Sequence, residues 1–232
     1  MPKPIPAYQY PPLLAPLRDD IQEAIRLSHP LDHWKLSKCK GSFLQCRSTL
    51  CPSCVRAHLH HQKGRVLAAC HSLPERRRKS LRFATFTTRD VRLQDLRVVA
   101  KESQTAVHKT LKSVGVTGSI SRLEASFPDW TDEVHPHTHV ILDSAPSGRS
   151  FIPRAEFTEA WREHLPEELH APESEVHIET IRDIVATSAY VTKSPFYDYV
   201  KEQADIERTI SVITALHGLP KLVAKGSLKL PN

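Results

Sequence analysis

A hairpin-like segment in the middle of the chain constrains the fold more than any other feature. Two runs rich in β-branched and apolar residues, Val116 to Phe127 and Val134 to Leu142, flank a turn-like segment at Pro128 to Glu133. Strands joined by so short a connection pair antiparallel, and a turn midpoint at about 130.5 places Glu124 opposite His137. The chain is therefore expected to contain an antiparallel sheet with this register.

The segments around the hairpin extend the pattern to a complete core. Strands are expected at 81–88 and 175–179, and helices at about 93–113, closed by Gly115, from about Pro153, and at 183–194. The order strand, helix, strand, strand, helix, strand predicts an α+β fold with a ferredoxin-like antiparallel sheet and helices on one face. A further helix near 206–216 and a strand-like tail follow.

The N-terminal third differs from this core in composition. Six prolines within residues 1–16 predict an extended, flexible tail. Residues 17–75 combine helical periodicity with a crowd of four cysteines between positions 39 and 54, which predicts a helical zinc-binding segment. We expect the ferredoxin-like domain to occupy residues 76–232.

The crowded cysteines indicate a metal site, since disulfides are unusual in a reducing compartment. A Cys-x-x-Cys pair has the spacing of a zinc knuckle, and two earlier cysteines complete a tetrahedral structural Zn²⁺ site. His58, three residues beyond the pair, remains an alternative to Cys39, and Cys70 is interpreted as a small apolar helix residue. The expected zinc ligands are Cys39, Cys46, Cys51 and Cys54.

The charge of the chain favours an anionic partner. Thirty-two Lys and Arg against 26 Asp and Glu give a formal net charge of +6, which favours a polyanion such as nucleic acid. No apolar run reaches the ~18 residues of a membrane span, so the expected location is the cytoplasm, without a membrane partner.

The clearest motif with chemical content is His135-Pro-His137-Thr-His139. Residues two apart on a strand share a face, so His137 and His139 can bind one metal ion. With the opposing Glu124 they form an open ligand set suited to Mn²⁺ or Mg²⁺. The alternative is a histidine-rich exposed strand beside a solvated glutamate. A different register would supply Asp132 or Glu133 as the carboxylate ligand.

Two further motifs are weak when taken alone and indicate a function only in combination with the histidine motif. Tyr190 and Lys193 lie three residues apart on an expected helix, so a phenol that attacks phosphorus and a cation that stabilises charge share one face. Alone, this pair is more typical of a packed tyrosine and a solvated lysine. The basic run Arg76-Arg77-Arg78-Lys79 fits either a DNA backbone contact or a solvated linker.

Together these motifs resemble, in order, those of rolling-circle replication initiators of small bacterial plasmids, members of the HUH endonuclease superfamily. The matching segments are LCPSC, FATFTTRD, RLEASF with HPHTHVIL, AYVTK and the tail KLVAKGSLKL. The resemblance implies a metal-dependent enzyme that nicks single-stranded or cruciform origin DNA, remains bound to the 5′ phosphate, and works with a host helicase and polymerase. It implies His137, His139 and Glu124 as metal ligands, Tyr190 as nucleophile and Lys193 as its partner.

One departure concerns strand closure at the end of the reaction. Members of this group often carry a glutamate four residues before the tyrosine, where this chain has Ala186. Tyr197 as a second nucleophile, or Asp183 as a base, would be alternatives; packing or solvent exposure of Tyr197 and Tyr199 is the simpler interpretation. Competing functions are an HUH transposase or relaxase, a metallo-phosphoesterase, and a non-catalytic zinc-dependent DNA-binding regulator.

Overall fold

The structure is a computed structural model, and its described residues separate into two compact units. The first unit contains residues 26, 34, 36–39, 51–58 and 206–210. The second unit contains residues 59–127, 133–143, 152–171, 176–193 and 211–231. The Pro-rich tail, Cys46, Tyr197 and Tyr199 lie outside the described residues, and the domain boundaries expected from sequence stay predictions.

Helices and strands follow one another largely as the sequence predicts. Three short elements, α4, β2 and η1, are additions to the expected set. In chain order the elements are α3 (Pro52–His71), α4 (Glu75–Lys79), β1 (Leu81–Thr87), β2 (Val91–Arg92), α5 (Leu96–Ser113), β3 (Gly118–Ser126), β4 (Glu133–Asp143), α6 (Arg154–His164), η1 (Glu167–Leu169), β5 (Val176–Thr180), α7 (Ile184–Val191), α9 (Ile206–Ala215) and β6 (Leu222–Gly226).

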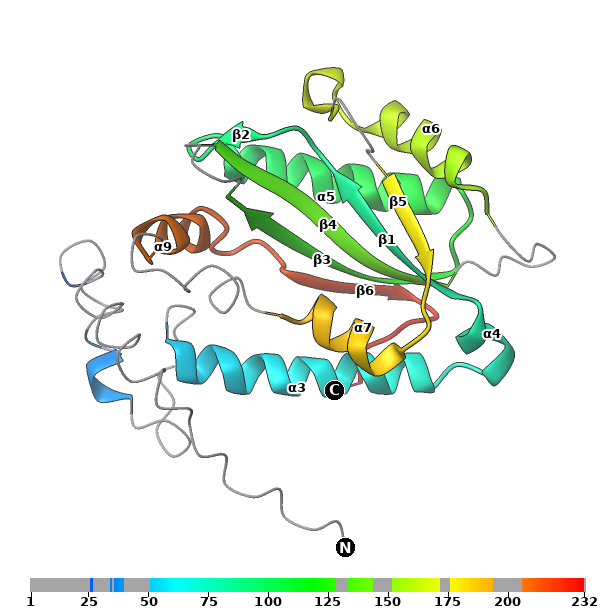
Figure 1. The fold of residues 1–232 in the computed structure, drawn as a ribbon, viewed down its shortest axis with the longest axis horizontal. Coiled ribbons are helices and arrows are strands. Elements are labelled where there is room, and N and C mark those ends of the chain that lie inside the picture. The colour runs from blue at the N-terminus through cyan, green and yellow to red at the C-terminus, as the bar shows by residue number, and fades with distance from the viewer. Residues whose placement is uncertain are drawn as a thin grey trace, which may run out of the picture. The chain divides into compact units, whose positions relative to one another are not determined.

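A six-stranded antiparallel sheet forms the centre of the second unit (Figure 1). Five strands lie in the order β5-β1-β4-β3-β6, and the short β2 pairs with the beginning of β4. All strand pairs are antiparallel. The predicted α+β class with an antiparallel sheet is thus confirmed, and the C-terminal tail contributes the edge strand β6.

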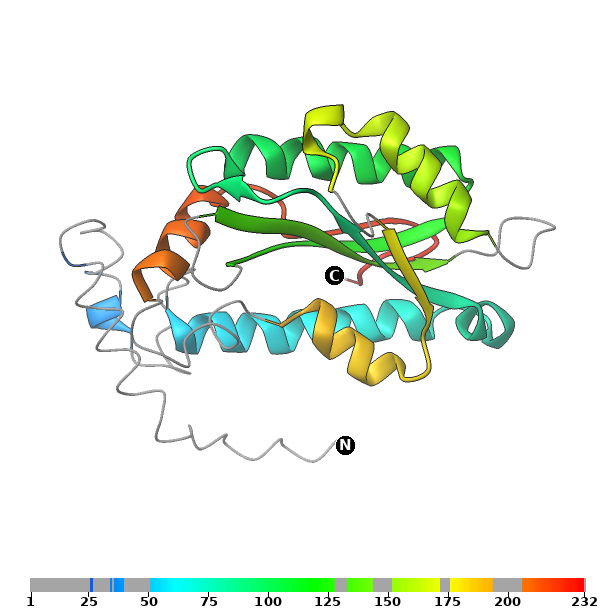
Figure 2. The same cartoon turned by 45° about the horizontal axis from the view of Figure 1, so that its top comes forward.

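Helices cover both faces of the sheet, so the expectation of helices on one face was wrong (Figure 2). One face carries α5 and α6, which bury Phe157 and Trp161 against Phe86 and Val140. The other face carries α3 and α7, which bury Cys70 and other apolar side chains against the sheet. From α3 the side chains of Val66, Ala69 and Cys70 contribute to the core on this face, and Leu73, just beyond the helix, joins them.

Two helix ends show how local sequence fixes the elements near the site. Gly115 has φ +79, a left-handed conformation that favours glycine and ends α5, as the sequence predicts. Asp183 caps α7, because its carboxylate accepts hydrogen bonds from the backbone N–H groups of Val185 and Ala186. The helix ends at Val191, earlier than expected. No helix among the described residues has the length and apolar character needed to cross a membrane.

Candidate metal centre

The predicted register of the central hairpin is confirmed. Strand β3 pairs with β4 so that Glu124 lies opposite His137, and Arg122 lies opposite His139. The two histidines are two residues apart on β4, so both side chains lie on the face covered by α3 and α7. The alternative carboxylate ligand Glu133 lies opposite Arg92 of β2 instead.

Glu124, His137 and His139, the acid–histidine cluster, bring their ligand atoms within 4.8 Å of one another. The Glu124 Oε2 atom lies 3.2 Å from His139 Nε2 and 3.8 Å from His137 Nε2. Glu124 and His139 are buried, whereas His137 is partly exposed. This arrangement can hold a metal ion that stays accessible from one side.

Hydrogen bonds on the far side of each imidazole orient the two rings. The Nδ1–H of His137 donates to the backbone carbonyl of His135 at 3.2 Å. His139 Nδ1 lies 3.0 Å from Thr85 Oγ1, on the neighbouring strand β1. Such partners fix the orientation of metal-binding imidazoles and leave Nε2 for the metal. Thr85 belongs to the FATFTT segment, but the sequence alone did not single it out.

Burial and charge set the protonation of the cluster. Burial opposes ionisation of Glu124, but the contact with His139 and the charges of His137 and Lys193 outweigh it and lower the pKa of this carboxyl to about 2. Burial, with the charge of His139 next, lowers the pKa of His137 to about 4. At neutral pH a carboxylate and a neutral imidazole therefore face each other, which are the forms that bind metal.

Unsatisfied polar atoms indicate that the cluster fits a cation. Both carboxylate oxygens of Glu124 and the Nε2 atom of His139 are buried without a well-aligned hydrogen-bond partner among the described residues. Buried polar atoms without partners are costly, and a bound cation would satisfy all three. Carboxylate and imidazole groups are both ligands that divalent metal ions bind.

Tyr190 and Lys193 lie beside the acid–histidine cluster, as the sequence predicts. The ring of Tyr190 makes an edge contact with His139, with centroids 4.9 Å apart, yet 44% of the residue is exposed. Lys193 Nζ lies 4.5 Å from the Tyr190 ring centroid and 3.2 Å from Glu124 Oε1. A tyrosine that touches a buried cluster while remaining accessible can reach a substrate held there.

Arg122 holds the end of the tyrosine helix against the sheet and was missed by the sequence analysis. This buried side chain donates from Nη2 to the backbone carbonyl of Lys193 at 2.9 Å. It also lies two residues before Glu124 on β3, so one strand positions both the carboxylate and α7. Phe83 adds a second support, since its ring packs against both His139 and Tyr190, with centroids 5.3 Å and 5.7 Å away.

Several other predicted residues have partners away from the cluster. Arg77 pairs with Asp143 at the end of β4, and Lys79 pairs with Glu75 at 2.7 Å. Asp183, considered as a base, uses its carboxylate to cap α7. His135, the first histidine of the motif, bonds to Asp90 at 2.5 Å rather than joining the other two.

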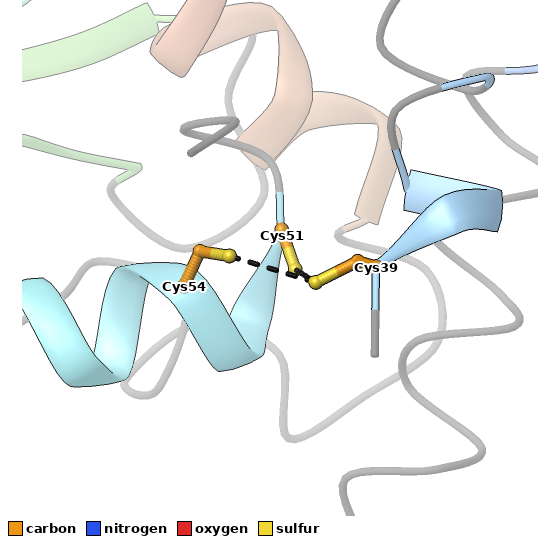
Figure 3. A group of neighbouring side chains, drawn as sticks. All are labelled: Cys39, Cys51 and Cys54. Carbon is orange, nitrogen blue, oxygen red and sulfur yellow. Dashed lines mark hydrogen bonds between the residues drawn. The ribbon is translucent and has the colours of Figure 1, made fainter. Parts of the chain in front are cut away.

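Three cysteines form a second candidate metal site, the cysteine cluster of Cys39, Cys51 and Cys54 (Figure 3). All three are buried, and Cys39 Sγ lies 3.6 Å from Cys54 Sγ and 3.7 Å from Cys51 Sγ. A tetrahedral zinc ion with Zn–S bonds of about 2.3 Å separates its sulfur ligands by about 3.8 Å. The cluster therefore has the dimensions of a thiolate metal site.

The other predictions about the cysteines concern the fourth zinc ligand and Cys70, and the structure describes only some of these residues. Cys39 belongs to the cluster, whereas His58 is exposed and is not part of it among the described residues. Cys46 lies in a segment that the structure does not describe. Burial raises the pKa of the Cys70 thiol to about 11, as expected for a small apolar core residue.

Comparison with known proteins adds one finding. A family model described as "Replication protein" matches residues 39–222, which include the cysteine cluster, the acid–histidine cluster, Tyr190 and Lys193. No curated protein and no solved structure matches the chain.

Proposed function

The chain belongs to the replication protein family, and we propose that it starts rolling-circle replication of a plasmid as an HUH endonuclease. It nicks one strand of single-stranded or cruciform origin DNA and keeps the new 5′ end on Tyr190. The observation that carries this proposal is the contact of an accessible tyrosine with a buried Glu-His-His set. That combination joins a nucleophile to a site for a phosphate-polarising cation.

Glu124, His137 and His139 would hold Mn²⁺ or Mg²⁺ in this proposal. When bound, such an ion polarises a phosphate oxygen and stabilises the charge that develops in the transition state. Thr85 and the His135 carbonyl keep the two imidazoles oriented, and burial keeps His137 neutral. These residues supply the geometry before substrate arrives.

Tyr190 would perform the strand cut as a transesterification. Its phenolic oxygen forms a bond to phosphorus while the bond from phosphorus to the 3′ oxygen breaks. The phenol loses one proton and the released 3′ hydroxyl gains one, so the step conserves atoms and the energy of the phosphodiester. Lys193, which contacts both the Tyr190 ring and Glu124, stabilises negative charge on the phenolate or the phosphate.

The cysteine cluster would have a separate, structural role. We propose that it binds Zn²⁺ with Cys46 as the fourth ligand, since thiolates select zinc and four protein ligands leave no open position. In the domain division proposed here, residues 17–75 form this zinc segment and residues 76–232 form the nuclease. Arg76 and Arg78 contact the DNA backbone, whereas Arg77 and Lys79 already face carboxylates.

A covalent complex on a denaturing gel tests the proposal. Purified protein is incubated with Mn²⁺ and 3′-labelled single-stranded DNA that carries the plasmid origin. The expected result is a labelled band at the mass of protein plus DNA, which disappears without divalent metal and in Tyr190→Phe, while this variant keeps its affinity for DNA. Cleavage without an adduct would indicate a phosphoesterase, and binding without cleavage a regulator.

A further inference from the structure

A hollow with both polar and apolar walls lies beside the acid–histidine cluster, and no part of the proposed chemistry uses it. It has a volume of about 570 Å³, within the range of small-ligand sites. Its lining comes from the end of β1, the loop that follows, the beginning of β4 and the segment after η1. The lining residues are Thr87, Thr88, Arg89, Asp90, Glu133, His135, His170 and Ala171.

The hollow begins one step along the strands from the metal ligands. Thr87, which lines it, lies opposite His137 in the sheet register. The ring of His135 lies 5.5 Å from that of His137, centroid to centroid. A two-residue step along a strand is about 6.7 Å, so a nucleotide adjoining a phosphate at the acid–histidine cluster reaches the hollow.

Hydrogen bonds fix the walls of the hollow before any ligand binds. Thr88 Oγ1 donates to the Pro136 carbonyl at 3.0 Å, and the Arg89 N–H donates to the Leu169 carbonyl at 3.0 Å. The His170 Nε2–H donates to the Leu165 carbonyl at 3.1 Å, which leaves Nδ1 as an acceptor. A site with fixed polar groups discriminates between ligands better than a mobile surface does.

The chemistry of the walls favours a base over a phosphate. Two carboxylates, Asp90 and Glu133, face the hollow beside a single arginine, Arg89. The carboxylates repel a phosphate. Glu133, the Asp90 oxygen that does not bond to His135, and His170 Nδ1 can accept hydrogen bonds from the amino group of a base. Thymine has no amino group, whereas adenine, cytosine and guanine each have one.

We infer that this hollow binds the base of one nucleotide next to the cleaved phosphate and selects bases that carry an amino group. The inference rests on the proposed nicking function, since it places the cleaved phosphate at the acid–histidine cluster. It makes Asp90 and Glu133 residues that determine sequence specificity. The preference they impose adds to whatever recognition the rest of the origin provides.

Covalent capture from a random DNA library tests the inference. The full chain is incubated with Mn²⁺ and single strands that carry a randomised segment, and both the attached DNA and the released 3′-hydroxyl fragments are sequenced. Glu133→Gln and Asp90→Asn each remove an acceptor charge at nearly constant shape. Glu163→Gln, an exposed carboxylate on α6 outside the hollow, is the matched control.

The expected wild-type result is depletion of thymine at one position within two nucleotides of the nick. In Glu133→Gln and Asp90→Asn this depletion should weaken about tenfold, with the base preferences at other positions and the Mn²⁺ affinity unchanged. Base preferences identical to wild type in both variants, or thymine enrichment at that position, would overturn the inference. Joint loss of capture and Mn²⁺ affinity would also overturn it. Absence of capture by the wild-type protein would instead refute the proposed function.

Discussion

The cysteine cluster and the acid–histidine cluster differ in how their ligands are placed. The cysteine ligands Cys51 and Cys54 come from one turn of chain at the start of α3, and all three sulfur atoms are buried. The acid–histidine ligands come from two paired strands, and an exposed tyrosine lies against them. The described ligands of the first site come from one stretch of chain, residues 39–54, whereas the second site depends on the pairing of strands in the sheet.

The two clusters also differ in the chemistry of their ligands. Thiolates form soft, closed sites that stabilise a local fold, while one carboxylate and two imidazoles leave coordination positions for substrate. In the proposed function, one chain separates a stabilising cluster from a reactive one. Damage to either cluster should then leave the other largely unaffected.

Loss of a reactive-site ligand should have the largest effect. We expect His139→Ala to lower adduct formation by about a thousandfold or more, because the remaining two ligands hold the cation poorly and no longer align the phosphate. Zinc content should remain at the wild-type value. The rate of adduct formation, measured on denaturing gels, and metal analysis of the same preparation give the result.

An exposed histidine provides the matched control for this variant. His60→Ala, on α3, should form adduct at the wild-type rate. An active His139→Ala protein would remove the acid–histidine cluster from the mechanism. Simultaneous loss of zinc would instead show that the two clusters are not independent.

Loss of a cysteine ligand should affect structure more than chemistry. We expect Cys51→Ser to lose its zinc and its amide protection around residues 51–58, with adduct formation changed less than about threefold. The part of α3 that packs in the core begins at Val66, about 18 Å along the helix from Cys54. The loss of amide protection should therefore stay at the beginning of α3. Hydrogen exchange measured by mass spectrometry resolves the two ends.

Cys70 separates zinc binding from a general effect of cysteine loss. Cys70→Ala removes a buried sulfur from the core, so it should cost about 1 kcal/mol of stability and retain the zinc. A Cys70→Ala protein without zinc would contradict the assigned cysteine cluster. A Cys51→Ser protein that keeps its zinc and the amide protection of residues 51–58 would contradict it as well.

Low pH should lower the stability of the metal-free protein through the groups of the acid–histidine cluster. The folded-state pKa of His137 is about 4, below its ordinary value, so the unfolded chain binds this proton first. Stability should therefore fall as pH is lowered from about 6.5 to 4, by an amount on the order of 1–3 kcal/mol. The Glu124 pKa of about 2 extends this loss below pH 4.

A comparison of wild type with His137→Gln isolates this contribution. Urea unfolding without added divalent metal should show a flatter dependence for the variant between pH 6.5 and 4. Protonation of the cysteine cluster affects both proteins alike and cancels in the difference. Parallel curves for the two proteins would show that His137 is not held neutral by the fold.

The smallest expected effect concerns Lys193, whose ammonium group lies 3.2 Å from Glu124. It repels a cation bound by that carboxylate, so Lys193→Met should raise Mn²⁺ affinity a few-fold, on the order of 0.5–1 kcal/mol. The same change should slow adduct formation, because the charge that stabilises the transition state is lost. Calorimetric titration and adduct kinetics measure the two effects; weaker Mn²⁺ binding would contradict this role.

The reactive pair Glu124 and His137 could be predicted because strand pairing follows a rigid geometry. A short turn and a two-residue period leave only one partner opposite each histidine once the turn is placed. Tyr190 and Lys193 were predicted to lie together for a different reason, the three-residue spacing that shares one face of a helix. In the structure Lys193 follows the end of α7, yet the three-residue spacing still brings it over the tyrosine ring.

The supporting residues could not be predicted in this way. Thr85 contacts His139 across 54 positions, and Arg122 contacts Lys193 across 71, so each contact depends on how separate elements pack. Strand β2 has only two residues, too few for a periodic pattern. The covering of the second sheet face depends on how the last turns of α3 pack against the sheet, and this packing joins separate elements in the same way.

The attachment point of the DNA tests the central claim most directly. Protein is reacted with Mn²⁺ and single-stranded origin DNA, digested with nuclease and protease, and its peptides are analysed by mass spectrometry. We expect a nucleotide linked through its 5′ phosphate to Tyr190, in the tryptic peptide that ends at Lys193. Attachment to Tyr197, Tyr199 or any other residue, with Tyr190 unmodified, would contradict the assignment of Tyr190 as the nucleophile.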